Sequence, residues 1–362
     1  MVPRKPGLVL ILCAAGCGRL GFEPASAPPG RPPPVLLHLD RAEVAESLVD
    51  FPLLVQLGDQ QLDRSRLRAD ARDLRFRIDG LLDGGFLEYE IEDPGAPGGA
   101  PVTAWVRIPD LVGHDTTIRV DYGDGGLAPE SSAPVWSASY AAVFHLATAS
   151  GARDATGHYP GPQVTEVGAP GPSPMPGRIS GGRGFDSTHG NAIQVNARDL
   201  MYSPFTVSGW LYETLVPQGY HALVSREHNG AGQNAFWIGD RGGLYRGELV
   251  DTAEVFVESG VPAIANRWVH LALTATTSVA TLYIDGAVVT TVGFGGLPAA
   301  GNAKPIVLGA DNNSAAATPD ADFLDGRLDE VRIETVARTA EWLRVDHLSM
   351  TDQLIRYEVA DE

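Results

Sequence analysis

The sequence predicts an all-β protein that consists of two tandem β-sandwich domains and one short helix near the C-terminus. From residue 50 onward, apolar residues recur at every second position over several segments, which is the pattern of strands with one buried face. Gly, Pro and Asp separate these segments at short intervals, as turns between antiparallel strands do. The chain has 362 residues, enough for two domains that each bury a core.

Five alternating segments lie in the first half of the chain. In residues 73–79 the apolar side chains share one face and the charged side chains the other, and residues 87–92 alternate in the same way. The remaining segments are residues 51–57, 102–108 and 118–122. Half-buried strands with little helix between them are typical of an antiparallel sandwich.

These segments also resemble a known bacterial domain. The motifs that carry the resemblance are FPLLV at 51–55, DLRF at 73–76, LEYEIE at 87–92, AWVRIP at 104–109 and TIRVDYG at 117–123. Together they are similar to the domain of unknown function (DUF) of family number 2341, here assigned to residues 37–130. That family has no established catalytic residues, so the resemblance implies an architecture and no activity.

The second half resembles a laminin-G-like (LamG-like) jelly roll of the concanavalin A type over residues 135–350. The motifs that carry it are FHL at 144–146, DATGH at 154–158, GFD at 184–186, FTVSGW at 205–210, RWVHLALT at 267–274, TLYIDG at 281–286 and GRLDEVRI at 326–333. Ser187 stands where the family has Gly. Asp285-Gly286 predicts a two-residue hairpin, because that turn needs positive φ.

One helix is expected near the C-terminus. Thr339 is a suitable N-cap for a helix over residues 340–348, which resembles the closing helix of these jelly rolls. Residues 351–362 are left as a C-terminal tail.

The first 36 residues contain targeting signals. Arg4 and Lys5 precede an apolar run at 8–12 that is much shorter than the roughly 20 residues needed to span a bilayer, so residues 1–16 are predicted to be a secretory signal peptide. AAGC at 14–17 resembles a bacterial lipobox, although Ala14 stands where Leu is commoner. The resemblance implies an exported protein whose Cys17 is lipidated and anchors it in the membrane.

The residues after Cys17 bear on where the anchored protein would lie. Residues 17–36 begin with this cysteine and continue as a Pro-rich tether. Gly18, rather than Asp, follows the cysteine and favours the outer membrane of the cell envelope. The alternative is an ordinary signal peptide that is cleaved nearby, with Cys17 incidental.

Composition excludes several classes of function. The net charge is −18, from 27 basic and 45 acidic side chains, which argues against nucleic acid as a partner. The two cysteines both lie within the first 17 residues, so a disulfide scaffold or four-cysteine zinc site is excluded. The sequence has no Gly-x-Ser-x-Gly and no His-Glu-x-x-His. We therefore predict that the protein is not an enzyme.

Paired carboxylates require separate consideration, because the jelly-roll fold also hosts glycosidases with Glu-x-Asp-x-x-Glu on one strand. Residues 329–334 come close, but no Glu lies two positions before Asp329. Glu88, Glu90 and Glu92 are expected on the solvated face of their strand, where they would pair with Arg75 and Arg77. Neither string meets the requirements of a glycosidase.

A structural Ca²⁺ is the cofactor that the sequence allows. Asp329 has the strand parity of Val331 and Ile333, so it is predicted to point into the core, where a carboxylate must be paired, hydrogen-bonded or metal-bound. The jelly-roll resemblance implies Ca²⁺ near the terminal strands, with Asp154 as a second ligand. The alternative is that Asp329 accepts hydrogen bonds from backbone N–H groups.

A second acidic segment also offers oxygen ligands. It contains Asp311, Asn312, Asn313, Asp320, Asp322 and Asp325. Because its spacing is not that of an EF-hand, we expect a solvated loop.

The predicted function is that of a non-catalytic envelope lipoprotein whose lectin-like jelly roll binds a glycan or another envelope or extracellular component. Trp210 and Trp268 lie within strand motifs and are expected in the core, whereas Trp237 lies near a Gly-rich turn. Trp237, Tyr245 and Arg241 are therefore the predicted glycan contacts. One alternative is a structural or protein-docking envelope lipoprotein, and another is a polysaccharide hydrolase.

The lipobox predicts the outcome of a single substitution. A Cys17→Ala protein should no longer incorporate radiolabelled palmitate, because the thiol that carries the diacylglyceryl group is gone. Metabolic labelling followed by immunoprecipitation measures this, with Cys13→Ala as the matched control that should still be labelled. Continued labelling of the Cys17→Ala protein would contradict the assignment.

Overall fold

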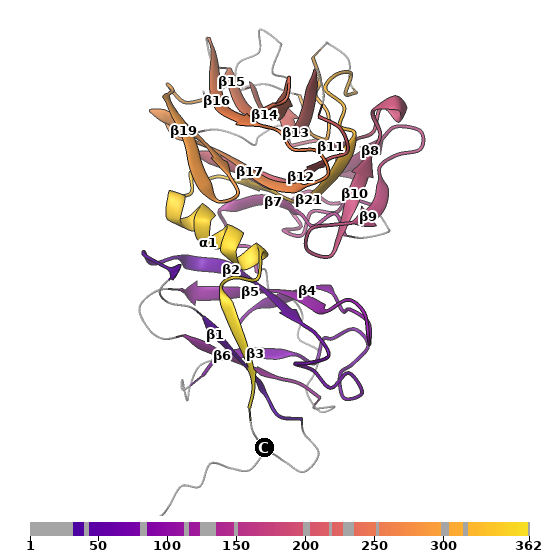
Figure 1. Cartoon of the computed structure of the whole chain (residues 1–362), viewed down its shortest axis with the longest axis vertical. Coiled ribbons are helices and arrows are strands. Elements are labelled where there is room, and N and C mark those ends of the chain that lie inside the picture. Colours follow the sequence, from indigo (N-terminus) through magenta and orange to yellow (C-terminus); the bar gives the residue numbers. More distant parts are fainter. Residues whose placement is uncertain are drawn as a thin grey trace, which may run out of the picture.

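The computed structural model has the predicted all-β architecture, with two stacked sandwiches and one helix between them (Figure 1). It describes residues 32–39, 43–79, 85–111, 116–123, 135–147, 151–197, 203–216, 219–226, 235–250, 253–297, 304–313 and 318–360. The predicted signal peptide, Cys17 and most of the predicted tether lie outside these residues. Within the described part of the chain, no helix has the length and apolar character needed to cross a membrane.

The first sandwich packs a four-stranded sheet, in the order β22-β1-β6-β3, against a three-stranded sheet, β2-β5-β4. The strands are β1 (Val35–Leu39), β2 (Val49–Leu57), β3 (Arg75–Ile78), β4 (Tyr89–Asp93), β5 (Val102–Asp110), β6 (Thr117–Asp121) and β22 (Ile355–Val359). The five predicted segments correspond to β2 through β6. Their apolar faces meet in one core that includes Leu53, Phe76 and Val106, all fully buried.

The last strand corrects the expected C-terminal tail. β22 pairs antiparallel with β1 over five residues, from Val35 opposite Val359 to Leu39 opposite Ile355. Leu354, just before it, is 1% exposed in the core of the first sandwich. Without β22, β1 would be an open edge with unpaired backbone groups. Sequence reasoning missed this strand because its partner lies at the other end of the chain.

The second sandwich is larger. One sheet has the order β19-β18-β17-β12-β21-β10-β9, with β7 also paired to β21, and the other has the order β16-β15-β14-β13-β20-β11-β8. The strands are β7 (Tyr140–Phe144), β8 (Val164–Val167), β9 (Ser173–Pro176), β10 (Gly181–Phe185), β11 (Ala192–Val195), β12 (Phe205–Glu213), β13 (Tyr220–Arg226), β14 (Ala235–Arg241), β15 (Leu244–Val250), β16 (Glu254–Pro262), β17 (Trp268–Ala275), β18 (Val279–Ile284), β19 (Ala287–Gly293), β20 (Ile306–Leu308) and β21 (Gly326–Glu334). The predicted hairpin joins β18 and β19, where Asp285 and Gly286 both have positive φ.

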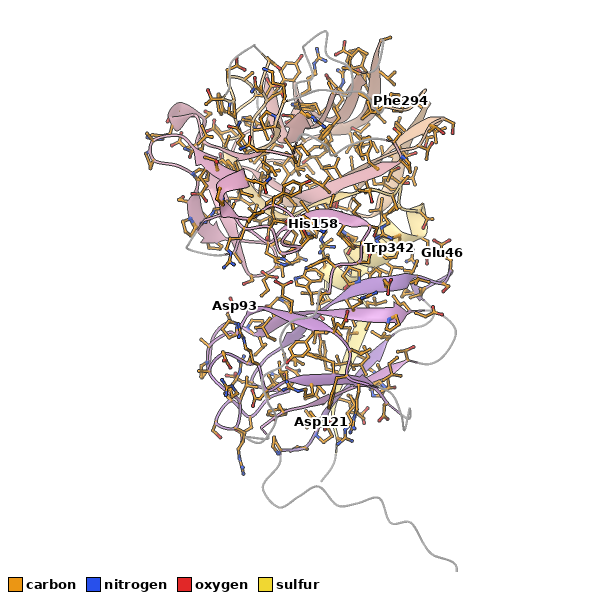
Figure 2. The ribbon with its side chains drawn as sticks, turned by 180° about the vertical axis from the view of Figure 1, so that it is seen from behind. Glu46, Asp93, Asp121, His158, Phe294 and Trp342 are labelled. Carbon is orange, nitrogen blue, oxygen red and sulfur yellow. The ribbon has the colours of Figure 1, made fainter. Side chains whose placement is uncertain are left out.

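Helix α1 (Ala340–Met350) joins the two sandwiches. The Thr339 hydroxyl accepts a hydrogen bond from the Trp342 N–H at 3.1 Å, as predicted for its N-cap. Trp342 and Leu343 belong to the core of the first sandwich, where the Trp342 ring lies 5.3 Å from that of Phe51. Figure 2 shows Trp342 at the junction. The helix therefore follows the jelly roll in sequence but buries its apolar face in the first sandwich.

The position of Leu354 gives a stability prediction. Leu354→Ala should destabilise the protein by about 2–5 kcal/mol, because it leaves a cavity where β22 closes the core. Urea unfolding followed by tryptophan fluorescence measures the change. The matched control is Val359→Ala on the same terminal segment, since Val359 is 41% exposed and its loss should change the stability by no more than about 0.5 kcal/mol. Equal effects of the two substitutions would show that β22 does not pack as described.

Candidate functional site

The structure separates the three predicted glycan contacts. Trp237 is fully buried, so the prediction of a surface tryptophan is wrong; its ring covers Gly239 and lies 5.9 Å from the ring of Tyr220. Tyr245 is also buried, in the core between the sheets. The turn at Gly242-Gly243 places Tyr245 opposite Asp240 rather than opposite Arg241, and this register turns its ring inward. Arg241 alone keeps the predicted surface position, with 34% of its side chain exposed.

Arg241 belongs to a group of side chains on the outer face of the sheet formed by β13 to β16. We name this group the arginine–aromatic face; it consists of Tyr220, Arg241, Arg246, Glu248 and Phe256. The Arg241 guanidinium lies 4.5 Å from the centre of the Tyr220 ring, and the Arg246 guanidinium 3.8 Å from that of Phe256. Such contacts between cations and aromatic rings are attractive.

A buried carboxylate holds both arginines of the arginine–aromatic face. Glu248 Oε1 accepts a hydrogen bond from Arg241 Nη1 at 2.8 Å and forms an ion pair with Arg246, whose Nε lies 2.9 Å away. Phe256 is 38% exposed, so an aromatic ring and a fixed guanidinium reach solvent side by side. This arrangement can stack against an apolar surface and donate hydrogen bonds to a polar group next to it.

The strand β21 contains an irregularity that changes the predicted role of Asp329. β12 pairs with it through Ser208 opposite Arg332 and Trp210 opposite Asp329, so β21 has one extra residue between these pairs. Glu330 takes up the insertion with a φ of 48°, as in a β-bulge. Leu328 and Val331 both face the core of the jelly roll. Strand parity across the bulge is therefore reset, and the prediction that Asp329 shares the inward face of Val331 is wrong.

The two predicted calcium ligands have separate roles. Asp329 Oδ2 accepts hydrogen bonds from the backbone N–H groups of Arg178 and Ile179 at 2.6 and 2.9 Å, which is the alternative that the sequence left open. Asp154 accepts from the backbone N–H groups of Val143 and Tyr159 at 3.0 and 2.9 Å. Each of these carboxylates therefore binds backbone N–H groups, and calcium binding by either one stays a prediction.

The expectation of a solvated loop is wrong for part of the second acidic segment. Asp311 and Asn312 are fully buried, and the Asp311 N–H donates to the carbonyl of Ala321 at 2.7 Å. Asp325 accepts hydrogen bonds from the backbone and hydroxyl of Ser187, both at 2.8 Å. These groups connect neighbouring loops of the jelly roll.

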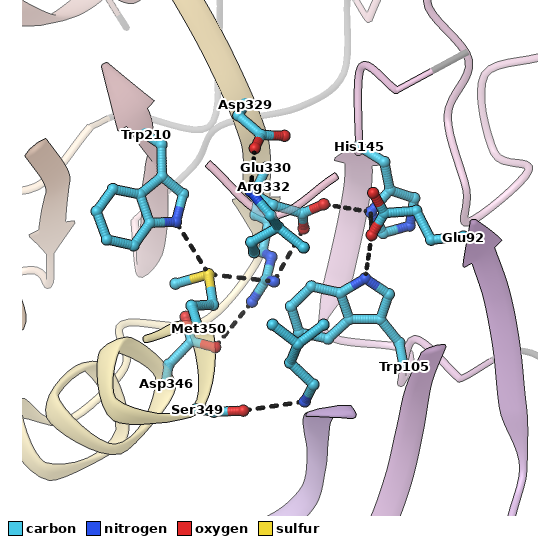
Figure 3. A network of polar contacts seen from close by, with 12 residues as sticks. Glu92, Trp105, His145, Trp210, Asp329, Glu330, Arg332, Asp346, Ser349 and Met350 are labelled. Carbon is cyan, nitrogen blue, oxygen red and sulfur yellow. Dashed lines mark hydrogen bonds and ion pairs between the residues drawn. The ribbon is translucent and has the colours of Figure 1, made fainter. Parts of the chain in front are cut away.

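A group of charged residues whose convergence sequence reasoning did not predict lies between the two sandwiches (Figure 3). We name it the interdomain network; it consists of Glu90, Glu92, His145, Asp329, Glu330, Arg332 and Asp346. Arg332 is 1% exposed and donates to Glu330 and Asp346 at 3.0 and 2.9 Å. Its guanidinium also lies 4.5 Å from the centre of the Trp105 ring and 5.2 Å from that of Trp136.

Burial and neighbouring charges shift the pKa values in this network. Burial, together with the Glu330 charge, raises the pKa of Glu92 to about 8. Burial alone would lower the pKa of His145, but the Glu330 carboxylate at 2.6 Å raises that pKa well above its ordinary value. Burial would likewise raise the pKa of Glu330, yet His145 and Arg332 hold it below its ordinary value.

The expected solvation of Glu88, Glu90 and Glu92 holds only for the first. Glu88 pairs with Arg107 at 2.7 Å near the surface, whereas Glu90 and Glu92 face the interdomain network. Arg75 and Arg77 are occupied elsewhere, by the Tyr89 hydroxyl at 2.8 Å and Asp121 at 3.2 Å. The sequence did contain one indication that this face is covered: Trp105 occupies a position of its strand that should face solvent in a free-standing sandwich.

The central position of Arg332 yields a testable prediction. Arg332→Met should cost about 3–5 kcal/mol in the free energy of unfolding, because it leaves Glu330 and Asp346 buried without their cation. Denaturant titration monitored by circular dichroism gives the value. Arg327→Met on the same strand is the control; Arg327 lies at the surface over the Tyr212 ring and its removal should cost less than about 1 kcal/mol. A loss at Arg332 as small as that at Arg327 would contradict its central role.

Comparison with solved structures finds similar chains of low sequence identity. Domain 4 of AbnA, a GH43 extracellular arabinanase from Geobacillus stearothermophilus, in complex with arabinotriose, is 16% identical, with 57% of this chain and 97% of that chain covered and a TM-score of 0.44. The binding domain of Paraclostridial Mosquitocidal Protein 1 is 17% identical, with 58% and 52% covered and a TM-score of 0.46. The botulinum neurotoxin serotype C1 binding domain is 15% identical, with 59% and 52% covered and a TM-score of 0.44. The chain thus spans about half the length of the last two.

Sequence comparison assigns the second sandwich. None of the curated proteins matches the chain. The family model Laminin_G_3, described as the concanavalin A-like lectin/glucanases superfamily, matches residues 186–344. This match agrees with the jelly-roll resemblance, and the resemblance of the first sandwich to family 2341 stays a prediction. Residues 186–344 of this chain form a domain of the concanavalin A-like lectin/glucanase superfamily.

Proposed function

We propose that this protein is a lipid-anchored component of the bacterial cell envelope whose concanavalin A-like domain binds a glycan without cleaving it. The observation that carries the proposal is the arginine–aromatic face, where Arg241 and Phe256 reach solvent together on a rigid sheet. The superfamily of the domain, which includes lectins and glucanases, supports a carbohydrate as the ligand class.

The chemistry of this face suits a sugar ring. One side of a pyranose presents C–H groups that can pack on the exposed part of the Phe256 ring. The guanidinium of Arg241 offers donors in a fixed fork to neighbouring hydroxyl groups. Glu258, on the adjacent strand, is 68% exposed at its side chain and offers acceptors. Glu248 is already engaged by two guanidinium groups, which supports binding rather than cleavage.

The arrangement of the chain supports a displayed domain. Ala360 N–H donates to the carbonyl of Pro34 at 3.0 Å, so the two ends of the described chain meet. They meet at the end of the first sandwich that lies away from the jelly roll (Figure 1). A lipid on Cys17, followed by the tether, would therefore attach the first sandwich near the membrane and present the jelly roll outward.

A glycan array tests the proposal with the chain from residue 18 onward, which keeps β22 and the first sandwich intact. Wild-type protein should bind a defined set of glycans, and Arg241→Ala and Phe256→Ala should each weaken that binding about tenfold or more, as expected for a central contact. The array is run with Ca²⁺ and with EDTA, so that a metal requirement becomes visible.

The matched control uses the other sheet of the jelly roll. Arg327 stacks on Tyr212 at 4.8 Å, as Arg241 does on Tyr220, and Arg327→Ala should bind glycans like the wild type. A flat array together with co-purified envelope proteins would instead favour a protein-docking role. Turnover of a bound polysaccharide would overturn the non-catalytic assignment.

A further inference from the structure

Three side chains of the interdomain network could act together as metal ligands. One ligand atom each of Glu92, His145 and Glu330 lies within 4.8 Å of the other two. Glu92 comes from β4 of the first sandwich, His145 directly follows β7, and Glu330 is the bulge residue of β21. We propose that Glu92, His145 and Glu330 bind one divalent transition-metal ion of the zinc class between the two sandwiches. This proposal does not depend on glycan binding.

Buried atoms without partners support this site. Glu92 Oε1 and His145 Nε2 have no hydrogen-bond partner, although the two side chains are only 2% and 10% exposed. His145 Nε2 lies 3.7 Å from Glu90 Oε2, and His145 Nδ1 lies 3.7 Å from Glu92 Oε2; both distances are too long for hydrogen bonds. Polar atoms buried in this way are costly unless something satisfies them.

One oxygen of each proposed carboxylate ligand accepts a hydrogen bond from a residue that is not itself a ligand, as in many metal sites. Trp105 Nε1 donates to Glu92 Oε2 at 2.9 Å, and Arg332 Nη2 donates to Glu330 Oε2 at 3.0 Å. Each donor binds one oxygen of its carboxylate. Glu92 Oε1 is left without a partner, and Glu330 Oε1 contacts His145 Nδ1 at 2.6 Å, a contact that a bound ion would replace. Figure 3 shows both oxygens near the His145 ring. Trp105 and Arg332 therefore already orient the two carboxylates, as residues around a metal site usually do for its ligands.

The charge of the interdomain network also favours a cation. The network contains the five acids Glu90, Glu92, Asp329, Glu330 and Asp346 and the two bases His145 and Arg332. Most of these acids are buried, and water cannot screen their mutual repulsion there. A bound divalent ion would add positive charge at the point where carboxylates from both sandwiches converge.

The ligand types select the class of ion. An imidazole nitrogen together with carboxylate oxygens is typical of Zn²⁺ and its neighbours, whereas Ca²⁺ prefers oxygen ligands alone. Glu90 lies at the rim with 27% of its side chain exposed, so it marks the side from which an ion would enter. The bound ion would tie β4 to β21 and hold the sandwiches together.

Zinc content tests the site in the intact chain from residue 18 onward. Protein stripped with a chelator, incubated with ZnCl₂ and dialysed should retain one zinc per chain by plasma mass spectrometry. Zinc should also raise the Tm, whereas CaCl₂ should not. Glu92→Gln and His145→Gln should each weaken zinc binding more than about 100-fold. Trp105→Phe removes the donor to Glu92 Oε2 but no ligand, and should weaken it by about 10-fold.

The control is a second buried histidine–glutamate pair in the jelly roll. His221 Nδ1 lies 2.9 Å from Glu213 Oε1, and His221→Gln should retain the wild-type zinc content. Circular dichroism verifies that each variant is folded. If a variant is unfolded, the zinc content of the wild-type protein still decides whether the site exists. No retained zinc in the wild type, or equal zinc in all variants, would overturn the site. A Tm raised by calcium and not by zinc would overturn the assigned ion class.

Discussion

The position of the two sandwiches relative to each other depends on one buried cation. Arg332 holds Glu330 on its own strand and Asp346 on helix α1, and its guanidinium packs over Trp105 of the first sandwich. A guanidinium that is 1% exposed cannot replace these partners with water. Strand β21, helix α1 and strand β5 therefore have to keep one arrangement. That arrangement also positions the other groups of the interdomain network.

Strand alternation in the sequence predicted most strands of the first sandwich but not what covers them. Period-two patterns identified β2 to β6, and Asp285-Gly286 identified the hairpin between β18 and β19, because these features are local. A pattern of two faces does not say whether the polar face meets water or another domain. Glu90 and Glu92 were accordingly placed in solvent. The bulge at Glu330 has no local signal either, and one inserted residue changed the direction assigned to Asp329.

The candidate binding face shows the same limit at the scale of single side chains. Arg241 was predicted from its position beside the Gly-rich turn, and it does reach the surface. Trp237 and Tyr245 were misplaced because their exposure depends on the neighbouring strands: Tyr220 and Gly239 accommodate Trp237, and the register of the β14–β15 turn directs Tyr245 inward. Tyr220 and Phe256 came to the same face through cross-strand pairing, which the linear pattern does not contain.

The pairing of β22 with β1 has a consequence for how the protein is made. Because the strand that completes the first sandwich comes after residue 350, the jelly roll is topologically an insertion within that domain. All strands of the inserted domain have been synthesised before the last residues of the chain. Strand β1 emerges early and has to wait for its partner until the chain is nearly complete. The order in which the two domains reach their final form is therefore the reverse of their order along the chain.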